Sequence, residues 1–149
     1  MKVLSENKKA YFNYQILEKY EAGIALNGQE VKSIKLGRIN LMGSYVIIRD
    51  REVYLLGANV PAYQPKNAPS DYDSQRTRKL LLRKPEIDYL FGKSQQKGLT
   101  MIPLKVYTNN GKIKVEFGLG KGKKMFDKRE TIKKRETEKE MRRELKIRG

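Results

Sequence analysis

The 149-residue chain contains neither cysteine nor histidine. These absences exclude disulfide frameworks, cysteine-bearing zinc sites and the Ser-His or Cys-His pairs of nucleophilic enzymes. No apolar run approaches the roughly 20 residues of a membrane-spanning helix, and the first residues do not resemble a secretory signal. The glycines of 118–124 lack the spacing of a phosphate-binding loop. We therefore expect a cytoplasmic, non-enzymatic protein without metal, cofactor or membrane contact.

Positive charge is abundant instead. The formal net charge is +16, and 13 of the last 29 residues are Lys or Arg whereas six are acidic. Such a segment has too few apolar residues to bury a core, so it is typical of a tail that seeks a polyanion, with nucleic acid the first candidate. The other 120 residues carry 20 basic and 11 acidic side chains. A basic surface is therefore expected on the folded part as well.

Three acid–base pairs lie at i, i+4 spacing in this tail: Glu130 with Lys134, Glu138 with Arg142, and Glu144 with Arg148. Each such pair stabilises a helix by only about 0.2–0.5 kcal/mol. The pattern predicts a frayed segment that becomes helical when a partner holds it. A permanently disordered, solubilising tail is the alternative.

The first 120 residues have the pattern of a small antiparallel β domain. A long strand is predicted over 13–26, one hairpin over 45–56, and a second over 102–117 around Asn109-Asn110-Gly111, a strong hairpin signal. Helices are predicted over 28–37, over 75–83 and from Pro85, and a proline-rich loop begins at Pro61. About five strands with two or three helices suit a small barrel or sandwich, and such barrels commonly bind nucleic acid.

Several side chains are candidates for RNA contacts. On a helix over 75–83, Arg76, Lys79 and Arg83 share one face that could follow a phosphate backbone, although a solvated face is equally consistent. Glu30 could accept a hydrogen bond from a base edge or a 2′-hydroxyl, but such an acid more often pairs with a nearby lysine. One or two aromatic side chains could stack on bases while the others pack in the core. These aromatic residues are Tyr11, Phe12, Tyr14, Tyr45 and Tyr63.

Five motifs together resemble one protein family. They are Asn7-Lys8-Lys9-Ala10, Tyr20-Glu21-Ala22-Gly23-Ile24, Glu30-Val31-Lys32-Ser33, Arg76-Thr77-Arg78-Lys79-Leu80-Leu81-Leu82, and Gly122-Lys123-Lys124 followed by Asp127-Lys128-Arg129. In order and spacing, from about Ser5 to Arg135, the chain resembles the SmpB (small protein B) family of bacterial trans-translation. The resemblance implies a mainly β, oligonucleotide-binding (OB-type) barrel over 1–120 with two or three flanking helices. A basic tail over 121–149, disordered when free, would follow it.

The resemblance also implies the partners. The barrel would bind the tRNA-like domain of tmRNA, and the tail would become a helix in the decoding centre and mRNA channel of the small ribosomal subunit. A monomer is expected. The residues expected at the RNA are Asn7, Lys8, Lys9, Tyr14, Glu30, Lys32, Ser33, Arg38, Arg76, Arg78, Lys79, Lys121, Lys123 and Lys124. Those expected at the ribosome are Phe126, Asp127, Lys128, Arg129, Ile132, Lys133, Lys134 and Arg135.

The chain departs from the family pattern at three places. Phe126 and Arg83 stand where the family usually has histidine, and Asp71-Tyr72 replaces Asn-His. Phe126 keeps a planar face for stacking but has no group that donates a hydrogen bond. Two other functions remain open from the residues alone: a nonspecific RNA chaperone or ribosomal protein, and a nuclease with a metal site around Asp71 and Asp73.

Overall fold

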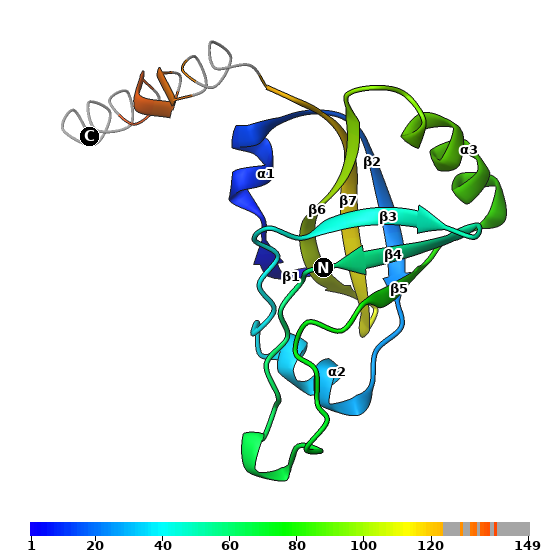
Figure 1. The fold of residues 1–149 in the computed structure, drawn as a ribbon. Coiled ribbons are helices and arrows are strands. Elements are labelled where there is room, and N and C mark those ends of the chain that lie inside the picture. Colours follow the sequence, from blue (N-terminus) through cyan, green and yellow to red (C-terminus); the bar gives the residue numbers. More distant parts are fainter. Residues whose placement is uncertain (124–128, 130–131, 134, 138, 140–149) are drawn as a thin grey trace.

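The computed structural model describes residues 1–123, 129, 132–133, 135–137 and 139. Residues 1–123 form a β-barrel with three α-helices beside it (Figure 1). The strands are β1 (Lys2–Glu6), β2 (Tyr14–Ile24), β3 (Tyr45–Arg49), β4 (Glu52–Leu56), β5 (Arg78–Leu81), β6 (Leu99–Asn109) and β7 (Lys112–Gly122). The helices are α1 (Lys8–Asn13), α2 (Gly28–Lys35) and α3 (Lys84–Ser94), with a short 3-10 turn at Pro65–Asn67. No helix of the described residues is long and apolar enough to cross a membrane.

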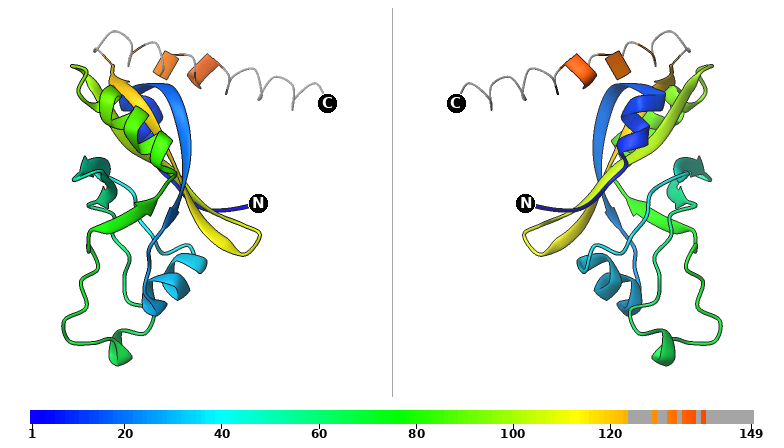
Figure 2. Two further views of the ribbon diagram at one scale, coloured as in Figure 1. Left: turned by 90° about the vertical axis from the view of Figure 1, so that its right-hand side faces the viewer. Right: turned by 90° about the vertical axis from the view of Figure 1, so that its left-hand side faces the viewer.

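The strands close into a ring in the order β6–β3–β4–β5–β2–β7 and back to β6, and every pair is antiparallel. One edge of β6 pairs with two strands: β3 pairs with it at Met101, and β1 pairs with it over 105–108. Figure 2 shows α1 and α3 towards one end of the barrel, and α2 with the loop 61–77 towards the other. The barrel therefore offers two separate ends to partners.

The long strands bend where the register shifts. These irregularities lie at Ile16/Glu18 in β2 and at Pro103/Lys105 in β6, where a proline without an N–H group is tolerated. Gly118 of β7 allows a close approach on the face of the sheet that packs against Ala10 of α1, because a Cβ atom there would lie 2.8 Å from Cγ2 of Ile16 and 3.1 Å from Cδ1 of Leu104. The bulges let β2, β6 and β7 curve around the barrel core, and this glycine leaves room for the second apolar cluster below α1.

The core fills the barrel with aliphatic side chains and one aromatic ring. α2 contributes Ile34 and α3 contributes Leu90, both fully buried, so each helix is held by an apolar anchor. The strands contribute Val46, Val53, Leu55, Leu80, Met101, Val106, Val115, Phe117 and Leu119. Burial of these side chains removes apolar surface from water and drives the closure of the ring.

The expected β-barrel is confirmed, with corrections to its parts. There are seven strands rather than about five in the described part of the chain, and α1 forms within the basic N-terminal lead. The helix predicted over 75–83 is wrong: residues 78–81 form β5, in which Arg78 and Leu80 are buried while Lys79 and Leu81 are exposed. This two-residue alternation and the pairing with β4 and β2 outweigh the helix propensity of the leucines. The turn at Asn110-Gly111 and α2 are observed as predicted.

Candidate RNA-binding surface

Glu30 is the centre of a buried ion cluster. Its side chain is fully buried, and its two oxygens accept hydrogen bonds from Nη2 of Arg76 at 2.6 Å and from Nε of Arg78 at 2.5 Å. Arg78 is also fully buried and donates to the carbonyl oxygens of Ala58 at 3.0 Å and Ser74 at 3.1 Å. The cluster ties α2, the loop 57–77 and β5 together.

Opposing effects act on the pKa of Glu30. Burial alone would raise the pKa, but the hydrogen bond from Arg76, the backbone N–H of Asn27 and the charge of Arg78 outweigh it and lower the pKa. The carboxylate therefore stays ionised. The same carboxylate accepts the N–H of Asn27 at 3.0 Å in the capping box that begins α2.

This cluster corrects two of the expected RNA contacts, Glu30 and Arg78. Both have no exposed surface, so they hold the fold together. Arg76 pairs with Glu30 but keeps 41% of its side chain exposed, so its contact with RNA stays a prediction. The pairing alternative for Glu30 is the observed one, with arginines rather than a lysine. Ser33 is fully buried as well, and its hydroxyl lacks a hydrogen-bond partner among the described residues. Lys79 is exposed but pairs with Glu52 at 2.9 Å.

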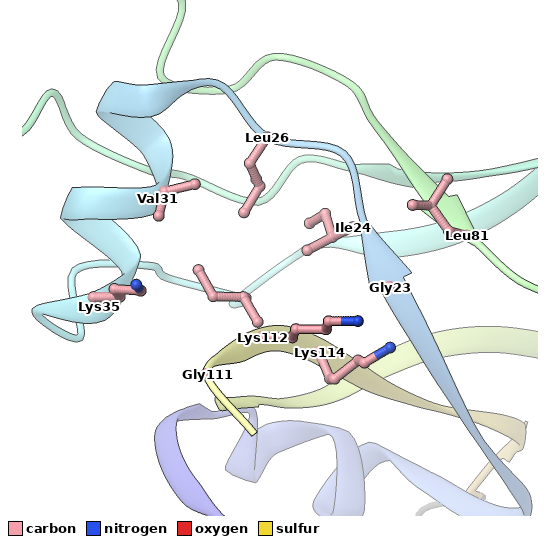
Figure 3. A pocket seen from close by; sticks show the side chains of 10 residues that line it. Gly23, Ile24, Leu26, Val31, Lys35, Leu81, Gly111, Lys112 and Lys114 are labelled. Carbon is pink, nitrogen blue, oxygen red and sulfur yellow. The ribbon is translucent and has the colours of Figure 1, made fainter. Parts of the chain in front are cut away.

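A basic groove lies between α2, β2 and the β6–β7 hairpin, and its volume is about 450 Å³. We call it the hairpin groove. Figure 3 shows apolar side chains facing this space, with Lys35 reaching it from α2 and Lys112 and Lys114 from the hairpin. None of the ion pairs among the described residues involves these three lysines. The apolar lining comes from Ile24, Leu26, Val31, Leu81 and Ile113.

The local sequence explains how these lysines come together. Lys35 ends α2, where a cation is favoured by the helix dipole. Lys112 and Lys114 lie two residues apart on β7, so they project from one face of the strand next to the tight turn. The sequence predicted the helix that carries Lys35 and the hairpin that carries Lys112 and Lys114, but it gave no sign that the three side chains meet. Three cations around an apolar lining can hold phosphates while a base or ribose covers the apolar part.

The outer face beside the groove carries a mixed polar network. Glu21 of β2 accepts a hydrogen bond from the hydroxyl of Tyr107, and Glu116 lies 4.0 Å from Lys19 and 3.8 Å from Lys105. Burial has the largest effect on the pKa of Tyr107 and raises it, and the hydrogen bond to Glu21 raises it further. Tyr107 therefore remains a neutral donor that holds the exposed carboxylate of Glu21 in place.

A second set of cations lies at the opposite end of the barrel, around α1 and the end of β7 (Figure 1). Lys8, Lys9 and Lys121 are exposed there. Lys123 donates to the carbonyl oxygen of Tyr11 at 3.0 Å, and its own N–H donates to Asn13 at 2.9 Å. These bonds attach the start of the tail to α1.

The other expected residues of this region are partly buried. Asn7 is buried and donates to the carbonyl oxygen of Pro103 at 2.9 Å, so it fixes the chain before α1. Tyr14 packs against Ala10 and Ile102 and lines a depression of about 420 Å³ that Lys9 and Tyr45 also border. Tyr14 thus presents only part of its ring to a partner.

Two expected residues, Lys32 on α2 and Arg38 after it, contact Tyr63. The Nζ atom of Lys32 lies 5.6 Å from the ring centroid of Tyr63, and Nη1 of Arg38 donates to the carbonyl oxygen of Tyr63 at 3.4 Å. The backbone of Tyr63 is fixed as well, because its N–H donates to Oε1 of Gln29 at 3.1 Å. These contacts anchor the loop 61–77 on α2.

Part of the tail can be placed. Arg129, Ile132, Lys133 and Arg135 are helical and exposed, and the hydroxyl of Thr137 donates to the carbonyl oxygen of Lys133 at 3.0 Å. The guanidinium of Arg135 lies 6.0 Å from the ring centroid of Phe12 in α1. The remaining residues expected at the RNA or the ribosome lie outside the described residues: Lys124, Phe126, Asp127, Lys128 and Lys134.

Acidic side chains do not gather into a metal site in the described part of the chain. No group of three or more aspartate or glutamate side chains there is arranged to hold a metal ion. The closed antiparallel barrel with lysines gathered at both ends defines a class, the RNA-binding β-barrel proteins.

Comparison with known proteins identifies the family within this class. The family description "SmpB protein" matches residues 4–147. The chain is 50% identical over 145 residues to an SsrA-binding protein of Acaryochloris marina, covering 97% of the chain and 94% of that protein. It is 49% identical over 147 residues to an SsrA-binding protein of Carboxydothermus hydrogenoformans, covering 99% and 98%. The chain belongs to the SmpB family.

A solved structure agrees in fold. A chain of the structure described as "tmRNA-SmpB: a journey to the center of the bacterial ribosome" is 48% identical, has a TM-score of 0.67, and is matched over 81% of this chain and 85% of that one. The barrel observed here is thus the SmpB fold.

Proposed function

We propose that this protein binds the tRNA-like domain of tmRNA and delivers it to stalled ribosomes, where trans-translation tags the nascent chain. The observation that carries the proposal is the hairpin groove, with three lysines around an apolar lining. Family membership, the relatives' name "SsrA-binding protein" and the tmRNA-SmpB title of the similar solved structure support this partner. The function is one of binding rather than catalysis, and its place is the cytoplasm.

The hairpin groove would receive the tRNA-like domain. Lys35, Lys112 and Lys114 stand on two different elements, so they can hold phosphates on both sides of a bound loop. A base or ribose between them would cover Ile24 and Leu81, and Leu81 is half exposed in the free protein. Apolar contact to an unstacked nucleotide and phosphate contacts around it distinguish a folded RNA loop from a regular duplex.

The other end of the barrel would face the small ribosomal subunit. β7 has eleven residues and runs from the hairpin groove to the start of the tail, a distance of roughly 35 Å at about 3.3 Å per residue. Lys8, Lys9 and Lys121 lie at that far end, and the tail follows. One protein would therefore contact two RNAs at once. We place the boundary between the barrel and the tail at the end of β7, two residues beyond position 120.

A triple variant tests the groove. Lys35→Ala, Lys112→Ala and Lys114→Ala are combined, and the control combines Lys2→Ala, Lys66→Ala and Lys97→Ala, which removes the same charge at exposed positions elsewhere. We expect the groove variant to bind the tRNA-like domain roughly 10- to 100-fold more weakly, since each lost phosphate contact contributes about 0.5–1 kcal/mol. The slope of log affinity against log salt should fall by about 2 to 3.

The binding assay is a titration of labelled tRNA-like domain against an excess of bulk tRNA. A specific partner of tmRNA keeps its affinity in this competition, whereas a nonspecific RNA chaperone loses it. If the groove variant and the control variant bind the tRNA-like domain with equal affinity, the RNA binds elsewhere and not in the hairpin groove.

A further inference from the structure

The turn between β3 and β4 has an unusual backbone for its sequence. Arg49 pairs with Glu52, so Asp50 and Arg51 are the two central residues of a tight hairpin, with φ angles of +51° and +61°. Tight hairpins of this kind favour Asn-Gly or Asp-Gly, because the second central residue needs a positive φ that glycine adopts most readily. Asp50 suits its position, whereas Arg51 occupies the position of the glycine.

The second hairpin of the chain is an internal comparison. Between β6 and β7, Asn109 pairs with Lys112, and the central residues Asn110 and Gly111 have φ angles of +53° and +76°. The geometry is the same, but the favoured Asn-Gly pair is present. An L-residue with a Cβ atom is strained in this region of φ. The β3–β4 turn is therefore less stable with Arg51 than it would be with glycine.

The two arginines of this turn form no ion pair within the described residues. Arg49 and Arg51 are exposed, and none of the ion pairs of the described residues involves either one. The neighbouring acid, Glu52, is already engaged by Lys79 at 2.9 Å and by the hydroxyl of Tyr54. Strain at Arg51 is thus not compensated by an ion pair within the barrel.

More positive charge lies nearby. The antiparallel register of β4 and β5 pairs Val53 with Leu80, and its continuation brings the turn towards Arg83, the residue before α3. α3 contacts β3, and Figure 1 shows the beginning of α3 beside the tip of this hairpin. Arg83 and Lys84 are exposed. Besides Glu52, the acids of this edge are Asp50 and Glu86, and Glu86 accepts the N–H of Arg83 at 3.3 Å.

A strained residue that the fold does not require is a reason to look for a function. We propose that Arg51, together with Arg49, forms a phosphate-binding site for RNA at the tip of the β3–β4 hairpin, separate from the hairpin groove. The planar guanidinium can hold two phosphate oxygens at once, which glycine at this position cannot do. The inference rests on the proposed function. The phosphates belong either to the tRNA-like domain or to the RNA of the small subunit.

The test uses one variant with two opposite effects. Arg51→Gly relieves the backbone strain, so the melting temperature should rise by about 2–5 °C after allowance for the more flexible unfolded chain. The same change should weaken RNA binding about three- to tenfold and lower the salt slope by about 1. Arg51→Lys keeps the charge but not the planar guanidinium, so its RNA affinity should lie between those of the wild type and Arg51→Gly. Lys97→Ala, an exposed cation elsewhere, is the control.

Two RNA targets distinguish the source of the phosphate. Binding is measured to the isolated tRNA-like domain and, separately, to small ribosomal subunits free of tmRNA. A loss on either target with Arg51→Gly, and none with Lys97→Ala, supports the site and identifies its partner. Unchanged binding to both targets, or an unchanged melting temperature, would overturn it. A different result would contradict the proposed function: displacement of the wild-type protein from the tRNA-like domain by an excess of bulk tRNA.

Discussion

Substitution of Glu30 by glutamine tests the ion cluster that joins α2 to β5. Glutamine keeps the shape of the side chain and one carbonyl oxygen, but it removes the negative charge that two arginines share. Arg78 then remains fully buried without a counter-ion, whereas Arg76 can turn part of its exposed side chain to water. The variant isolates the effect of one buried charge.

The expected destabilisation follows from this geometry. Removing one partner of a buried ion pair costs about 3–5 kcal/mol. The lower end applies here, because Arg78 still donates to the carbonyl oxygens of Ala58 and Ser74. A loss of about 3 kcal/mol corresponds to a fall of roughly 10–15 °C in melting temperature for a domain of this size.

The matched control is Glu52→Gln. Glu52 also pairs with a cation, Lys79, at 2.9 Å, but both side chains are nearly half exposed, so the expected loss of stability is much smaller than for Glu30→Gln. Urea denaturation followed by circular dichroism gives the free energy of unfolding of both variants. If the two losses differ by less than about 1 kcal/mol, burial does not set the strength of the Glu30 cluster and the reasoning is wrong.

Three further predictions concern pH and the tail. Because the pKa of Glu30 is lowered in the folded state, the stability that Glu30 contributes is complete above pH 4.5, the ordinary pKa of a glutamate, and is lost as the pH falls below that value. In this acidic range the urea midpoint of the wild type should drop more steeply than that of Glu30→Gln. The pKa of Tyr107 is raised in the folded state, so the stability that Tyr107 contributes holds below pH 10.0 and is lost as the pH rises above that value. Tyr107→Phe should therefore lose less stability in the alkaline range, and an equal dependence of the urea midpoint on pH in both proteins would contradict this prediction. Ending the chain after Lys124 should leave the circular dichroism of the barrel and most tmRNA affinity intact but abolish tagging on stalled ribosomes; normal tagging would reduce the tail to a solubilising segment.

Local patterns in the sequence predicted much of the fold. The Asn-Gly turn located the β6–β7 hairpin, and the helix predicted over 28–37 is observed as α2, which ends two residues earlier, before Gly37 with its positive φ. These signals work because a tight turn or a helix end restricts φ at one or two neighbouring residues. The excess of lysine and arginine over acids likewise indicates a polyanionic partner, because net charge depends on composition alone.

The prediction over 75–83 was wrong for a reason that lies outside that segment. Its leucines and charged residues suit a helix, but Arg78 finds its counter-ion on α2, 48 residues away. Pairing with β4 and β2 then makes the segment a strand. No local pattern identifies such a partner, so Arg78 and Glu30 were expected at the RNA although the fold buries them.

By itself, the sequence determined the class of partner, the positions of the tight turns and the family to which the chain belongs, because each of these depends on residue type and short-range spacing. Only the tertiary structure decided which cations remain available. It enclosed Arg78, attached Lys123 to α1, and brought Lys35 of α2 beside Lys112 and Lys114 of the hairpin. Closure of the barrel joins segments far apart in the chain, and whether a charge is paired or free is set by those long-range contacts.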